Sequence, residues 1–215
     1  GLDMANRNAA DAQSLLDNVE SAHNEIANIL QRMRELAVQG ANDTNSSADR
    51  TNIRTELTAL RNEIDAISNQ TKWAGNTLVS AATTFVFQVG NAGSETITVT
   101  TSQVNASGLS VSDVSGLTTA ASFTAFINTV NSAVATIASY RASYGADSNR
   151  LDHTMSNLAT NAESVKASLG RIQDADYAKE TTDLAKSQIL QQAATSMLAQ
   201  ANQVPQSVLT LLERA

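Results

Sequence analysis

Apolar residues recur along much of this chain at alternating steps of four and three residues, the spacing of a helix that packs against other helices. The pattern predicts one helix over residues 2–39 and a second that begins after Ser46. Gly40 and the polar turn at 42–45 separate them, and Ser46 with Asp49 resembles a capping box. The two apolar stripes are Ile26, Leu30, Met33 and Ala37, then Ile53, Leu57, Leu60, Ile64 and Ile67.

The same spacing predicts a long third helix that begins near Thr119 and extends to about Ile172. If continuous, it would be about 80 Å long at ~1.5 Å per residue. Gly145 lies in its middle and allows a break, since glycine costs about 1 kcal/mol relative to alanine in a helix. The second half of its stripe is Leu151, Met155, Leu158, Ala162, Val165, Leu169 and Ile172.

The pattern changes between the second and third helices. Phe85, Phe87 and Val89 alternate with other residues, and Ile97 and Val99 do so after the turn at 91–93. This period of two predicts a β-hairpin, and we expect another short strand and a loop over 104–118. The predicted fold is therefore mainly α, an elongated antiparallel helical rod of coiled-coil type with a small β-hairpin region.

Residues 187–212 form the most unusual segment, because none of them carries a charge. Glutamines and asparagines interrupt the segment, so it does not read as a membrane span. Its seam could fold back on the chain's own rod, or it could assemble with other subunits, which we favour. The seam residues are Leu190, Ala194, Met197, Ala201, Val204, Val208 and Leu211.

Composition argues against other functions. A net charge of −7 disfavours nucleic acid and anionic lipid as partners, and the absence of cysteine excludes thiolate metal sites and disulfides. His23 and His153 stand outside any zinc motif, and Asp174 with Asp176 reads as a solvated turn, so we expect no catalysis, metal or cofactor. No basic-then-apolar signal peptide is present.

Several motifs, in order, resemble those of bacterial flagellin. They are residues 31–39 (QRMRELAVQ), 62–71 (NEIDAISNQT), 170–177 (GRIQDADY), 188–192 (QILQQ) and 199–206 (AQANQVPQ). The resemblance covers nearly all of residues 1–79 and 119–215. It implies a rod domain of residues 1–79 and 119–177, a hairpin and loop region at 80–118, and a carboxyl-terminal inner-core segment at 178–215.

The resemblance also implies where this sequence differs from the family. The family's amino-terminal inner-core helix would precede Gly1, and the variable outer domains would stand where only residues 80–118 are found. We therefore expect a chain with these limits to stay mostly monomeric, because the partner helix of the carboxyl-terminal segment is absent.

The function that the resemblance implies is that of a structural subunit of the flagellar filament, self-assembling, extracellular and exported without a cleavable signal. The implied partners are other flagellin subunits, an export chaperone at the carboxyl terminus, hook-associated and cap proteins, and Toll-like receptor 5 of hosts. The receptor contact carries over to Arg32, Leu36 and Glu56. Leu36 lies about a quarter turn from the apolar stripe, so we expect it to be exposed beside Arg32.

Two alternatives remain open. One is a hook-filament junction protein of the same structural class. The other is a flagellin-like cell-surface protein that binds an external ligand, such as a glycan, through the Ser/Thr/Asn-rich region at 80–118.

Overall fold

The computed structural model describes the backbone of residues 1–173 and 177–212 and the side chains of residues 1–173 and 177–201. The chain divides into two compact units, Gly1–Glu163 and Ser164–Ala215. The hydrophobic core lies in the first of these units.

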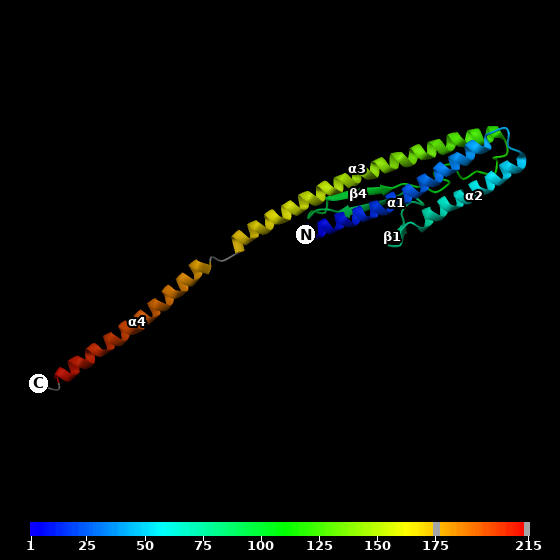
Figure 1. Cartoon of the computed structure of the whole chain (residues 1–215). Coiled ribbons are helices and arrows are strands. Elements are labelled where there is room, and N and C mark those ends of the chain that lie inside the picture. Colours follow the sequence, from blue (N-terminus) through cyan, green and yellow to red (C-terminus); the bar gives the residue numbers. More distant parts are fainter. Residues whose placement is uncertain (174–176, 213–215) are drawn as a thin grey trace. The chain divides into compact units, whose positions relative to one another are not determined.

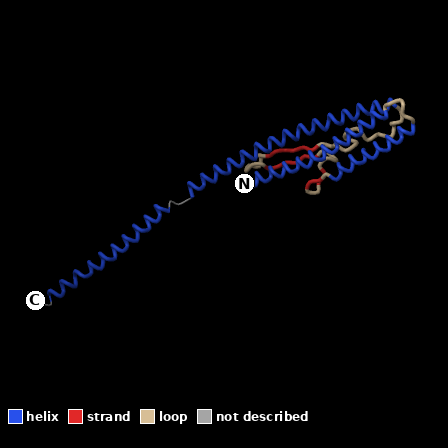
Figure 2. The backbone as a smooth tube through the Cα atoms, in the orientation of Figure 1, coloured by secondary structure: helices blue, strands red, loops and turns tan. Residues whose placement is uncertain are grey.

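The first unit is built on three helices that lie side by side (Figure 1). They are α1 (Leu2–Gly40), α2 (Ser47–Gln70) and the greater part of α3 (Ala120–Gln173). Helices α2 and α3 both run antiparallel to α1, and the strands lie along the same bundle (Figure 2). The predicted mainly helical fold with a small hairpin is confirmed.

Helix α1 buries a wider face than a single seam. Its buried residues include adjacent pairs that repeat every seven positions, whereas a helix with one neighbour buries a narrower stripe. Helix α1 therefore has neighbours on more than one side and lies at the centre of the core. The pairs are Leu15 with Leu16, Ala22 with His23, Ile29 with Leu30, and Leu36 with Ala37.

The turn from α1 to α2 is fixed by polar contacts. The hydroxyl of Ser46 accepts a hydrogen bond from the backbone N–H of Asp49, and the Asp49 carboxylate accepts one from the Ser46 N–H. This is the predicted capping box. The Ser46 hydroxyl also donates to the Asp49 carboxylate at 2.6 Å, and this bond, followed by the one from the Ser46 N–H, lowers the pKa of Asp49. Arg50 donates to the carbonyls of Gly40 and Asn42 and closes the turn.

The predicted hairpin is present as β3 (Thr83–Gln88) and β4 (Thr96–Thr101), antiparallel, with Phe85 opposite Val99. A second, much smaller hairpin joins β1 (Lys72–Trp73) to β2 (Asn76–Thr77). Its two turn residues, Ala74 and Gly75, both have positive φ. The sequence pattern did not predict these two short strands.

The strand expected within 104–118 is absent from the described structure, where this segment is a loop of turns. Its backbone bonds both to side chains and to distant backbone: the N–H of Ala106 donates to the carboxylate of Asp65, and the N–H of Val104 donates to the carbonyl of Val79. Its apolar side chains enter the core instead of alternating between two faces. The buried ones are Val104, Ala106, Leu109, Val111, Val114 and Leu117.

Helix α3 is continuous through Gly145, so the break allowed by the sequence does not occur. Its start is marked by Thr119, whose hydroxyl accepts from the N–H of Ser122. Because Tyr144 and Leu151 are buried on either side of Gly145, packing against the rest of the bundle offsets the low helix propensity of glycine.

We predict that Gly145→Ala stabilises the first unit by about 0.5–1 kcal/mol in urea unfolding. A Cβ added at Gly145 meets no atom within 4 Å, so only the backbone term changes. Gly40→Ala is the matched control, because its Cβ would lie 2.6 Å from the ring of Phe123 and should destabilise the fold. Destabilisation by Gly145→Ala would contradict a continuous helix at this point.

Candidate assembly surface

Helix α4 (Tyr177–Leu212) exposes every described side chain along its length, from Tyr177 to Ala201. Within the predicted seam, Leu190 is 61% exposed and Met197 is 72% exposed, and Ala194 and Ala201 are also exposed. The backbone is helical at the three remaining seam positions, whose side chains lie outside the described residues. These positions are Val204, Val208 and Leu211.

The apolar surface of α4 is wider than the predicted seam. Leu184, Ile189 and Leu198 are also exposed. At about 100° per residue, these three lie roughly 80–120° from the centre of the seam. A helix with apolar residues on most of its sides is typical of a buried position with several neighbours. The four-three spacing follows only one face of the helix and therefore missed these residues. Ile189 and Leu198 could have been identified from the sequence, because both lie between uncharged neighbours.

The end of α3 belongs to the same unit as α4, and its apolar side chains are exposed as well. Val165, Leu169 and Ile172 continue the predicted stripe and are 57%, 48% and 83% exposed. In the first unit the same stripe is covered, since Leu151 and Leu158 are buried. The stripe therefore runs on beyond the compact core of the first unit.

These exposed side chains define what we call the apolar surface of the second unit: the residues at 165, 169, 172, 184, 189, 190, 197 and 198. Burying one Leu, Ile, Val or Met side chain contributes roughly 1.5–3 kcal/mol. Single helices without such burial are only marginally stable in water. The surface is therefore suited to association, and its helices gain most of their stability when it is covered.

The predicted receptor contact contains a surface ion pair. Arg32 donates to Glu56 at 2.8 and 3.1 Å and to Glu35 at 3.1 Å, and the Arg32 and Glu56 side chains are about half exposed. The hydrogen bonds that Arg32 donates to Glu56, followed by the one that it donates to Glu35, raise the pKa of Arg32. The pair connects α1 to α2.

The expected exposure of Leu36 is wrong. Its side chain is only 2% exposed and belongs to the core. The physical reason is the wide buried face of α1, because the pair Leu36 and Ala37 packs between two neighbours instead of bordering one seam. Arg32 and Glu56 lie together at the surface, and Leu36 lies beneath it.

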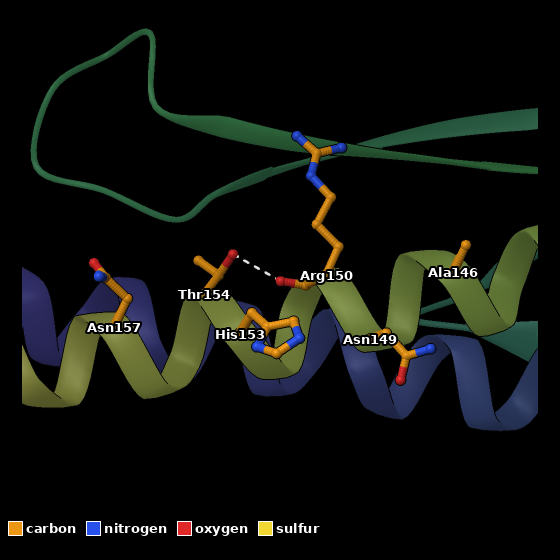
Figure 3. Close-up of a pocket in the computed structure, with 6 residues that line it drawn as sticks. All are labelled: Ala146, Asn149, Arg150, His153, Thr154 and Asn157. Atoms are coloured by element: carbon orange, nitrogen blue, oxygen red, sulfur yellow. Dashed lines mark hydrogen bonds between the residues drawn. The ribbon is translucent and has the colours of Figure 1, made fainter.

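The two histidines differ in environment. His153 is exposed on α3 in a shallow hollow whose six lining residues all come from that helix (Figure 3). In this hollow the Thr154 hydroxyl donates to the Arg150 carbonyl at 2.8 Å, and the lining contains neither a carboxylate nor a second imidazole. His153 therefore has no acid-base partner in this hollow.

His23 is fully buried in α1. Burial lowers the pKa of its imidazole, and Arg141 lowers it further, against the opposing effects of the Val19 carbonyl and of Glu20. Among the described residues, no three His, Asp or Glu side chains gather in a way that could hold a metal. Asp174 and Asp176, considered above as a turn, lie outside the described residues.

None of the helices in the described part of the chain is long and apolar enough to cross a membrane.

Comparison with known protein families matches both ends of the chain. Residues 1–84 match the bacterial flagellin N-terminal helical region, and residues 127–212 match the bacterial flagellin C-terminal helical region. The second match includes all of α4 and the end of α3, where the apolar surface lies.

A curated flagellin from Halalkalibacterium halodurans is 39% identical over 99% of this chain and 79% of its own length. The crystal structure of Bacillus cereus flagellin superposes with a TM-score of 0.64 at 34% identity, covering 74% of this chain and 94% of that one. A putative flagellar hook-associated protein from Vibrio parahaemolyticus superposes with a TM-score of 0.66 at only 17% identity, covering 79% and 90%. That last likeness shows a shared fold alone.

Proposed function

Because this chain belongs to the bacterial flagellin family, it is a structural subunit of the flagellar filament, and we propose that it assembles through the apolar surface of its second unit. The filament is extracellular, and the family is structural. The identity to a flagellin favours this reading over a hook-filament junction protein, which rests on fold likeness at 17% identity.

The exposure of Leu190, Met197 and Ile172 carries the proposal. Contacts between different faces of identical subunits are open and propagate into helical filaments. An uncharged helix face removes like-charge repulsion between copies that carry a net charge of −7 each. Many weak contacts repeated along a filament then add to a stable assembly.

The domain organisation belongs to the same proposal. Residues 1–79 and 119–177 form the rod domain, 80–118 its hairpin and loop region, and 178–215 the carboxyl-terminal inner-core segment. The compact packing of the first unit ends at Glu163, before residue 177. We expect residues 164–177 to gain their neighbours only in the assembled filament.

Other partners belong to the same proposal. An export chaperone would cover the apolar side chains of α4, such as Ile189 and Leu198, before assembly, and hook-associated and cap proteins would meet the filament ends. The support for the chaperone is the exposure of these side chains, which would otherwise promote premature association.

We predict that Leu190→Asp and Met197→Asp, introduced into the gene that encodes this chain, abolish filaments in electron micrographs of the bacterium. Each change places a carboxylate where the filament interior would have to desolvate it, at several kcal/mol per ion. Gln192→Asp adds the same charge on the polar side of α4 and should leave filaments intact.

The amount of subunit exported to the medium is measured in parallel, since lost export would also remove filaments. Normal filaments from both seam variants would contradict assembly through this surface. If Gln192→Asp also abolished filaments, α4 would tolerate an added charge on neither side. The effect of the seam variants would then not be specific to the seam.

Recognition by Toll-like receptor 5 is proposed for the Arg32 and Glu56 pair, without Leu36, whose side chain is buried. We predict that Arg32→Glu weakens binding to the receptor's ectodomain at least tenfold, because it repels Glu56 and reverses a charge at the contact. Arg34→Glu, two positions along the same helix, lies on a different side and should bind like the parent chain.

Surface plasmon resonance on folded monomer measures both variants, with circular dichroism to verify the helical content. Equal binding by Arg32→Glu and the parent chain would contradict the contact.

A further inference from the structure

The imidazole of His23 has a defined tautomer and one unsatisfied nitrogen. Its Nδ1 lies 2.8 Å from the carbonyl oxygen of Val19. Because a carbonyl oxygen only accepts, Nδ1 must carry the hydrogen, and Nε2 of the neutral ring then carries a lone pair. That Nε2 atom is buried and has no hydrogen-bond partner among the described residues. An unsatisfied buried polar atom calls for an explanation, such as a role in titration.

The groups that face His23 come from its own helix and from α3. Tyr144 and Tyr140 meet its ring edge to face, with centroids 5.3 and 6.4 Å away. Glu20 of α1 and Arg141 of α3 form an ion pair at 2.7 Å, and their charges act on the imidazole in opposite directions. Burial therefore remains the dominant influence on its protonation.

The same cluster holds the β-hairpin. The hydroxyl of Tyr144 accepts a hydrogen bond at 2.9 Å from the backbone N–H of Ser102, which directly follows β4. Asp147 is the next charged group along α3 and acts on Tyr144. A disturbance at His23 therefore reaches α3 and, through Tyr144, the end of β4.

A hollow of about 110 Å³ beside the cluster gives solvent a route to it. It is lined by Glu20, Arg141, Tyr144 and Gly145, among others. Three of these four residues also act on His23 or pack against it. His23 itself does not line this hollow, so proton uptake at Nε2 requires side chains of the cluster to move.

We infer that His23 is an acid-sensitive switch in the first unit, in which proton uptake at Nε2 loosens the packing of α1 on α3 and weakens the attachment of the hairpin. The imidazolium would bring a buried N–H without an acceptor and a charge that the balanced Glu20 and Arg141 pair does not neutralise.

The direction of the effect follows from the two states of the chain. In the unfolded chain His23 takes up a proton near pH 6.5, whereas burial holds its pKa below 6.5 in the folded chain. Above pH 6.5 both states are neutral and stability is complete. As the pH falls below 6.5, only the unfolded state binds the proton, so the unfolding equilibrium constant rises by up to about tenfold per pH unit until the folded-state pKa is reached.

Urea unfolding of the 215-residue chain, followed by circular dichroism from pH 7.5 to 5.0, tests the switch. We expect the parent chain and His153→Gln to lose stability in parallel, because His153 is exposed on α3 and lies outside the His23 cluster. His23→Leu, which keeps a buried side chain but cannot take up a proton, should remove most of that loss. An equal pH dependence in His23→Leu and the parent chain would overturn the inference.

A second measurement on the parent chain covers the possibility that His23→Leu fails to fold. The imidazole Cε1–H signals in NMR spectra report the titration of the two histidines separately. We expect the His23 signal to titrate below pH 6.5, or His23 to remain neutral until the first unit unfolds. A His23 titration at or above pH 6.5 would overturn the inference, since it would mean that the tyrosine rings stabilise the imidazolium by cation-π contact.

Discussion

The fold depends on covering the apolar stripes that run along its long helices. In the first unit the stripe of α1 is enclosed by neighbours on more than one side, and that of α3 is covered through Leu158. In the second unit the apolar side chains at the end of α3, such as Val165, and those of the described part of α4 are exposed. Apolar side chains with the same spacing are therefore buried in a core in the first unit and exposed to solvent in the second.

That contrast explains how a structural subunit can fold alone and still be ready to assemble. The first unit has its own core, its capping box at Ser46 and its hairpin, so it does not need a partner to fold. The described side chains of α4 are all exposed. If the second unit assembles as proposed, burial between subunits would supply the stability that a single chain lacks.

Much of the fold could be predicted from the sequence, because local signals and packing agreed. The four-three spacing gave the three long helices of the rod, and the Ser46 and Asp49 pair gave the start of α2. The alternation around Phe85 and Val99 gave the hairpin. In each of these elements, burial of the patterned residues and the intrinsic preference of the segment point to the same structure.

The questions that the sequence left open, and the expectations that were wrong, lie where tertiary packing overrides a local pattern. Gly145 does not break α3, because buried neighbours hold the helix on both sides. The segment 104–118 contains residues that favour strands, but it forms a loop whose apolar side chains are buried in the core. The Asp65 carboxylate accepts a hydrogen bond from its backbone. Leu36 is buried since α1 has more than one neighbour, a fact that a single stripe does not reveal.

The candidate site was only partly predictable for the same reason. The seam through Leu190 and Met197 follows from spacing, whereas the wider surface that includes Leu184 and Ile189 emerges only when all sides of the helix are considered. His23 lies on the core side of a repeating pair, so its burial could have been predicted from the sequence. Its unsatisfied nitrogen could not, because that depends on neighbours from α3.

Hydrogen exchange measured by mass spectrometry, on dilute chain and on filaments that contain it, tests the central claim most directly. In dilute chain we expect the amides of residues 164–212 to exchange far faster than those of the buried part of α1, and in filaments to become protected. Slow exchange of residues 164–212 in the dilute chain would mean that the chain covers its own apolar surface. That result would contradict assembly as the role of this surface.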